Sequence, residues 1–109
     1  MTERPLREPT FLILTSLAAG AQHGYGIMTD VSRISGGRVR LRAGTLYATL
    51  NRLAVERLVE VDREEIVDGR LRRYYRLTPQ GGQRLEAEVD RMRRNTAVAA
   101  RRLGLLGGA

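Results

Sequence analysis

Residues 41–58, LRAGTLYATLNRLAVERL, contain the pattern around which the rest of the chain is organised. Leu46, Leu50 and Leu53 recur at i, i+4 and i+7, which predicts a helix with one apolar face turned toward a core. A second face is small and uncharged at its first three positions and ends in a basic residue. It is formed by Thr45, Ala48, Thr49 and Arg52.

This second face has the size and chemistry of a helix that enters the major groove of DNA. Small hydroxyl side chains and an arginine can reach base edges and phosphates, whereas bulky or acidic residues would block the approach. The alternative is an ordinary amphipathic surface helix, although such helices usually carry several charges on the outer face. The flanking segments distinguish these two interpretations.

Composition limits the class of protein. A chain of 109 residues is long enough for one domain with its own core. Cysteine is absent and histidine occurs once, so there is little material for a metal site or nucleophilic catalysis. No apolar run reaches the ~20 residues of a membrane span, and the N-terminus lacks the core of a signal peptide. We expect a cytoplasmic protein that is not an enzyme, with no cofactor, metal or membrane partner.

The net charge of +7 comes entirely from arginine, since all 19 basic residues are Arg. Arginine binds phosphates and base edges in a bidentate manner, which suits nucleic acid. A genome-wide bias in base composition explains the same usage equally well. Because the charge is spread evenly along the chain, it permits a nucleic-acid partner but does not locate one.

Two helices are expected before the central stretch. Residues 8–19 predict a first helix that is apolar over most of its circumference. Its own domain can cover one side of this helix, and a partner subunit could cover the other. Residues 23–26 (HGYG) predict a turn that opens a second helix, in which His23 has a turn or capping role rather than a catalytic one. Residues 38–42 alternate arginine with Val39 and Leu41, which predicts a short edge strand.

Residues 58–66 and 70–77 predict a β-hairpin around the turn at 67–69. Placing the apolar residues on one face pairs Val61 with Tyr75 and Val59 with Leu77, and leaves a three-residue loop with Gly69 in the left-handed region. On the outer face this register pairs Glu60 with Arg76 and Glu64 with Arg72, and it places Arg63 opposite Arg73. The arginines left for phosphate are Arg70, Arg73 and Arg63.

Residues 78–103 predict a long last helix, with Thr78 as N-cap and Pro79 at the first position. It carries a 4-3 heptad seam at Leu85, Val89, Met92, Thr96, Ala99, Leu103 and Leu106. At 1.5 Å per residue it would run about 39 Å, longer than its own domain could cover. A helix folded back on its own domain is the alternative, but the sustained 3.5-residue period favours a partner helix. Gly104, Gly107 and Gly108 mark its end.

Several strings, in this order, resemble the PadR family of bacterial transcriptional regulators. They are HGYGI (23–27), GTLY (44–47) with Leu50 and Arg52-Leu53, Gly69-Arg70, YYRLTP (74–79) and Gly81. The resemblance covers nearly the whole chain, and the single short C-terminal helix is similar to that of the family's smaller subgroup. The resemblance implies a mostly α fold with a small β wing: a winged helix-turn-helix DNA-binding domain over 1–77 and a dimerisation helix over 78–109, in one compact unit.

The resemblance also implies a homodimer that binds a palindromic operator in double-stranded DNA, often represses, and is often released by a small-molecule effector near the dimer interface. The DNA-binding residues would be Tyr25, Arg42, Gly44, Thr45, Tyr47, Ala48, Thr49, Arg52, Arg63, Arg70 and Arg73. The dimer-interface residues would be Phe11, Leu14, Leu17, Leu85, Val89, Met92, Thr96, Ala99 and Leu103.

Two positions depart from the family pattern. The family often has Pro where Ala48 stands and usually has Gly where Arg57 stands, at the end of the central helix. An Arg in the left-handed region would cost ~1 kcal/mol, which favours a helix end of another kind. The chain has no Trp and one Phe, so it has few residues that could stack on a flat aromatic effector. Two alternatives are left: an apolar pocket between the first and last helices, or no ligand at all.

Two other classes of function compete with DNA binding. A winged helix used only for protein contacts would show no salt-dependent DNA binding, and it gives no reason for the small polar face of the central helix. An enzyme would need a pair of titratable groups at useful spacing, which the sequence does not offer.

Overall fold

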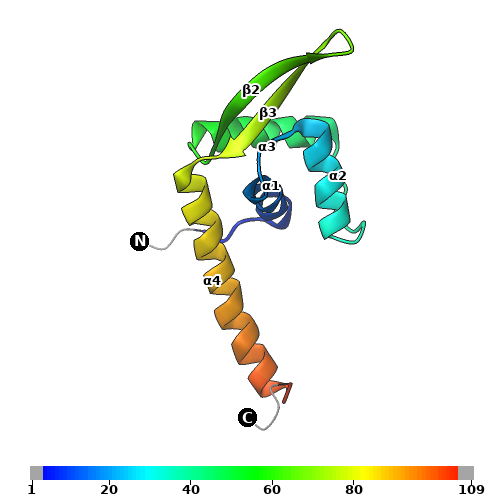
Figure 1. Cartoon of the computed structure of the whole chain (residues 1–109). Helices are drawn as coiled ribbons and strands as arrows, with labels where there is room; N and C mark the ends of the chain where they lie inside the picture. Colours follow the sequence, from blue (N-terminus) through cyan, green and yellow to red (C-terminus); the bar gives the residue numbers. More distant parts are fainter. Residues whose placement is uncertain (1–3, 106–109) are drawn as a thin grey trace.

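The structure is a computed structural model that describes residues 4–105 (Figure 1). In chain order its elements are α1 (Glu8–Ala18), β1 (Gln22–His23), α2 (Gly24–Ile34), α3 (Ala43–Val55), β2 (Val59–Val67), β3 (Arg70–Leu77) and α4 (Pro79–Arg102). The three strands form one antiparallel sheet in the order β1-β3-β2. This is the mostly helical winged helix-turn-helix architecture that the sequence predicts.

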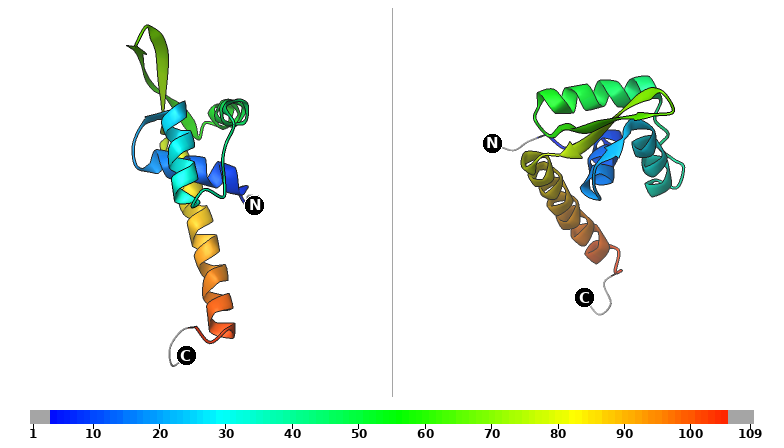
Figure 2. Two further views of the ribbon diagram at one scale, coloured as in Figure 1. Left: turned by 90° about the vertical axis from the view of Figure 1, so that its right-hand side faces the viewer. Right: turned by 45° about the horizontal axis from the view of Figure 1, so that its top comes forward.

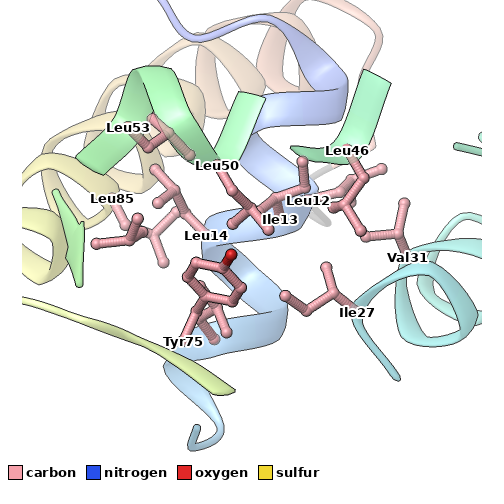
Figure 3. Packing of buried hydrophobic residues seen from close by; sticks show 12 residues of the cluster. Leu12, Ile13, Leu14, Ile27, Val31, Leu46, Leu50, Leu53, Tyr75 and Leu85 are labelled. Atoms are coloured by element: carbon pink, nitrogen blue, oxygen red, sulfur yellow. The ribbon is translucent and has the colours of Figure 1, made fainter. Parts of the chain in front are cut away.

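Helix α1 is the centre of the core and is surrounded by α2, α3, β3 and α4 (Figures 1 and 3). Its residues Leu14 and Leu17 are only 0% and 3% exposed, because the chain's own elements cover the side of the helix on which they lie. The prediction that a partner subunit covers Leu14 and Leu17 is therefore wrong. Phe11 lies half-buried at the edge of the core and keeps a surface that a partner could contact.

Residues 38–42 form no strand, contrary to the prediction. Val39 and Leu41 turn inward and pack against the core, while the arginines between them point to solvent, which explains the alternation without a sheet. The hydroxyl of Ser35 fixes this segment by accepting from the Val39 N–H at 2.9 Å. The third strand is instead Gln22–His23, whose two residues pair with Tyr75 and Tyr74 and are too few to give a periodic signal.

The predicted hairpin register is correct at the base of the wing and wrong at its tip. Val59 pairs with Leu77, Glu60 with Arg76 and Val61 with Tyr75, as predicted. A β-bulge between Val61 and Arg63 then shifts every later pair, since one strand carries an extra residue.

The bulge changes both the turn and the charge pairs of the wing. Glu64 faces Arg73 instead of Arg72, and Arg63 faces Tyr74 instead of Arg73. The connection shortens to two residues, Asp68 and Gly69, with φ of 52° and 75°. Positive φ at both positions matches the turn whose twist suits a two-residue hairpin.

Helix α3 ends in the left-handed conformation, contrary to the prediction. Arg57 has φ 63°, its N–H bonds the carbonyl of Ala54 at 3.0 Å, and the Leu58 N–H bonds that of Leu53 at 2.9 Å. These two bonds form a Schellman motif, in which glycine is the usual residue. The arginine is therefore held in a backbone conformation that its side chain disfavours.

We expect Arg57→Gly to stabilise the fold by about 0.5–1 kcal/mol. Relief of the left-handed backbone, about 1–2 kcal/mol, exceeds the added entropy of the unfolded chain, about 0.4–1 kcal/mol. Urea unfolding would measure the gain as a higher midpoint at unchanged slope. Ala54→Gly, within the same helix, is the control and should lose about 1 kcal/mol. An equal or lower midpoint for Arg57→Gly would show that the end of α3 is unstrained.

The end of α3 is tied directly to the start of α4. Thr78 caps α4 by accepting from the Gly81 N–H at 2.9 Å, and its hydroxyl donates to the Arg57 carbonyl at 2.6 Å. A Cβ on Gly81 would overlap the carbonyl oxygen of Leu58. Glycine is required here because two backbones approach closely, and the direction of α4 relative to α3 is thereby fixed.

Helix α4 starts on the domain and then leaves it (Figures 1 and 2). Leu85, 9% exposed, belongs to the core, so little of its side chain is left for the predicted dimer contact. Val89 and Met92 are half-buried, and Thr96, Ala99 and Leu103 are exposed; Leu106, Gly107 and Gly108 lie outside the described residues. The later part of the seam is thus uncovered in the single chain.

No helix within residues 4–105 is long and apolar enough to cross a membrane.

Candidate nucleic-acid interface

The outermost residues of α3 form a ridge on the side away from the core. Leu46, Leu50 and Leu53 are 0% exposed and fix which face points inward. At about 100° per residue, the positions opposite them carry small or uncharged side chains, all exposed. This ridge, which we call the α3 ridge, consists of Gly44, Ala48, Asn51 and Val55.

The α3 ridge differs in part from the face predicted from sequence. Ala48 is on it, but Thr45 and Arg52 lie on one flank of the helix beside Thr49. Thr49 is half-buried, and its hydroxyl donates to the Thr45 carbonyl at 2.9 Å. Asn51 was missed, although the 4-3-4 spacing that begins at Gly44 could have identified it together with Val55.

One flank of α3 faces the wing across a groove, which we call the wing groove. Its lining residues are His23, Gly24, Tyr25, Tyr47, Val67, Asp68, Arg70, Leu71, Arg72 and Arg73. A Cβ on Gly24 would overlap the Tyr47 hydroxyl, so glycine lets this tyrosine lie against the start of α2. His23 caps α2, as predicted, because its Nδ1 accepts from the Gly26 N–H at 3.2 Å. Burial and the charge of Arg72 lower the pKa of His23.

Two of the three wing arginines proposed for phosphate already have carboxylate partners. Arg63 donates to Glu65 at 2.8 Å and lies over the Tyr74 ring, 3.9 Å from its centroid. Arg73 donates to Glu64 at 2.8 Å. These hydrogen bonds raise the pKa of both arginines. The predicted like-charge pair between them does not form, because the bulge shifts the register.

Arg70, at the tip of the wing, is exposed and has no ion pair within residues 4–105. Arg76 instead bonds Glu60 at 2.8 Å, as the predicted register requires at the base of the wing. Of the wing arginines predicted to hold phosphate, Arg70 is therefore the one most available to an external anion.

The other flank of α3 borders a second groove, of about 670 Å³, formed with the segment that precedes α1. We call it the N-terminal groove. Its lining residues are Arg4, Pro5, Leu6, Arg7, Pro9, Thr10, Thr45, Thr49, Arg52, Glu56, Leu58 and Arg84. Arg52 donates to the Thr10 hydroxyl at 3.0 Å and pairs with Glu56 at 3.6 Å. Viewed along α3, the wing and the N-terminal segment lie on either side of the helix (Figure 2).

The remaining predicted residues lie near the start of α3 or beside it. Tyr25, 74% exposed, lines the wing groove from α2. Arg42 precedes α3 and is exposed, and a Cβ on Gly44 would meet no atom within 4 Å. Within residues 4–105 no group of three or more acidic or histidine side chains could hold a metal ion. Helix α3 therefore protrudes between the wing groove and the N-terminal groove, both of which are lined in part by arginines.

Residues 13–87 match the model of the transcriptional regulator PadR-like family, which is well over half of the chain. The chain belongs to this family. The family is one of transcriptional regulators, which is the class of protein that the sequence predicted. The transcriptional regulator Rv3488 of Mycobacterium tuberculosis is 42% identical to this PadR-like chain over 69 residues, which are 63% of this chain. The chain spans 61% of that relative's length.

Two solved structures extend the similarity to the fold of this PadR-like regulator. A PadR family regulator from Clostridium difficile has a TM-score of 0.73 and 26% identity, covering 90% of this chain and all of that one. Bacillus subtilis PadR, solved in complex with operator DNA, has a TM-score of 0.68 and 25% identity, covering 76% of this chain and 47% of that one.

Proposed function

We propose that the chain is a sequence-specific DNA-binding repressor that acts as a homodimer on a palindromic operator. The observation that carries the proposal is the α3 ridge, small and free of charge, between two grooves lined with arginine. The operator complex of Bacillus subtilis PadR, a relative of the same fold, supports the same partner for this chain.

In the proposed complex the α3 ridge enters the major groove. Gly44 and Ala48 allow a close approach to the bases, and Asn51 can bond both the N6 and N7 positions of an adenine. Thr45 and Thr49 lie beside the ridge and would contact bases or sugars. Contacts to phosphate position the helix but carry no sequence information. Those contacts come from Tyr25, Arg42, Tyr47, Arg52 and Arg70.

The second copy of the chain would pack on the uncovered part of α4. The seam residues available for this contact are Val89, Met92, Thr96, Ala99 and Leu103. Two reading helices would then enter successive major grooves, about 34 Å apart. Phe11 on α1 lies half-buried at the edge of the core, so an apolar effector that releases the repressor would bind between α1 and α4 at this interface.

The wing provides a test by comparison of two arginines. We expect Arg70→Ala to weaken binding to all duplexes about equally and to lower the slope of log affinity against log salt by about one. Arg76→Ala is the matched control: its side chain is bonded to Glu60, so affinity should change little. Fluorescence anisotropy with labelled duplexes at several salt concentrations measures both. A larger loss for Arg76→Ala would contradict this assignment, and an absence of salt-dependent binding by the wild type would indicate a protein-contact module.

A further inference from the structure

The N-terminal segment is held against the domain by its backbone, not by its arginine side chains. The Leu6 N–H donates to the Glu88 carboxylate at 3.2 Å, and Arg84 donates to the backbone carbonyl of Arg4. Glu88 is only 3% exposed, and its hydrogen bond with Arg91 lowers its pKa, so the anchoring carboxylate stays ionised. The backbone of residues 4–7 is thereby fixed along one wall of the N-terminal groove.

The charges that line the N-terminal groove are unbalanced. Four arginines line it against a single acidic residue, Glu56. Glu56 forms an ion pair with Arg52, and Glu88 forms an ion pair with Arg84. Arg4 and Arg7 are exposed and form no ion pair with any residue in the range 4–105. An external anion can therefore reach two unneutralised guanidinium groups.

The position of this groove relative to α3 indicates which anion it meets. An α-helix with its side chains is about 10–12 Å across, and the major groove is about 12 Å wide. A helix in that groove consequently has one sugar–phosphate backbone along each flank. The wing groove, with Arg70, accounts for one flank; the N-terminal groove borders the other, where Thr45 and Thr49 form its α3 wall.

We propose that the N-terminal groove is a second phosphate-binding surface, in which Arg4 and Arg7, together with Arg52, hold the DNA backbone on the side of the major groove opposite the wing. This rests on the proposed function and extends it, because it assigns a DNA contact to the segment before α1. The protein then contacts the phosphates of both DNA strands in each half-site. The contacts are to phosphodiester oxygens, so they contribute affinity and register on every sequence.

The test removes the side chains of Arg4 and Arg7 and then identifies the DNA phosphates whose contacts are lost. Arg4→Ala/Arg7→Ala should lower the salt slope of duplex binding by about two, since each phosphate contact contributes about 0.9. Arg94→Ala/Arg101→Ala is the matched control: it removes the same charge from exposed positions on the side of α4 away from the seam, and the slope should not change.

Ethylation interference then assigns the contacts. The wild type should show two clusters of critical phosphates in each half-site of a duplex selected from a random pool. The Arg4→Ala/Arg7→Ala variant should lose one cluster and keep the other, and Arg70→Ala should do the reverse. Neither variant removes a side-chain bond to residues 4–105, so melting temperatures should match the wild type.

The possible results separate this inference from the proposed function. An unchanged slope and both phosphate clusters in the Arg4→Ala/Arg7→Ala variant, with weaker binding by Arg70→Ala, would overturn the N-terminal groove and leave DNA binding in place. A wild type that selects no duplex and shows no salt-dependent binding would overturn both.

Discussion

Met92→Glu should convert the protein to monomers and weaken binding to a palindromic duplex by about 10²–10⁴-fold. Met92 is half-buried on the seam of α4, at the point where the domain stops covering the helix. A carboxylate there would be buried between two subunits without a partner, at a cost of several kcal/mol. Once the dimer is lost, each monomer binds one half-site without the effective concentration that a linked second site provides.

Sedimentation velocity and anisotropy with a palindromic duplex measure this effect. Ala87→Glu is the matched control, because it adds the same charge to an exposed position of the same helix away from the seam. It should stay dimeric and bind normally. Leu85→Glu is unsuitable, since Leu85 is part of the core and a glutamate there would unfold the domain. A Met92→Glu protein that sediments as a dimer and binds its duplex like the wild type would refute the seam.

Elements with a long apolar period could be predicted from the sequence. The spacing of Leu46, Leu50 and Leu53 placed α3 correctly, and the alternation of Val59 and Val61 gave the base of the wing. Both patterns report which side chains face the core, and burial of apolar surface decides that face. The capping residues His23 and Thr78 were also predictable, because each side chain can accept from the backbone N–H three residues later.

Features set by local backbone geometry or tertiary contact could not be predicted. At the bulge the Asp62 carboxylate accepts hydrogen bonds from Arg63 and Arg76, which strict alternation does not reveal. Arg57 occupies the left-handed region because Thr78 and the Schellman bonds hold the end of α3. An apolar side chain such as Leu14 looks the same in sequence whether its own domain or a partner covers it.

The candidate site was predicted more closely on its helix than around it. Ala48 was expected on the face of α3 turned away from the core and lies there, whereas Thr49, expected on the same face, lies on a flank. The N-terminal groove was not foreseen, because it joins Arg4 and Arg7 to a helix that begins more than thirty residues later. Such a groove exists only after α1 has folded into the core and brought both segments together.

The largest effect on DNA binding is expected from Ala48→Glu. Ala48 is exposed on the α3 ridge and contributes nothing to the core, so the melting temperature should stay close to that of the wild type. In the major groove the added carboxylate would meet the phosphates of both strands and lose solvation. Like-charge contact of this kind costs several kcal/mol, so affinity should fall by at least about 100-fold.

The control is Ala48→Gln, which has nearly the same size without the charge. Ala48→Gln should retain more affinity than Ala48→Glu, because glutamine brings the same bulk into the groove without a charge that the phosphates repel and with a smaller cost of desolvation. Thermal unfolding by circular dichroism confirms that both variants are folded before binding is compared.

The most direct test of DNA reading by α3 is the affinity of folded Ala48→Glu for the duplex that the wild type selects from a random pool. The α3 ridge predicts that the wild type enriches a palindrome with half-sites about one helical turn apart, and that Ala48→Glu binds it at least about 100-fold more weakly. A folded Ala48→Glu protein that binds the selected duplex as tightly as the wild type would place another surface of the molecule in the groove and contradict the proposed function of α3.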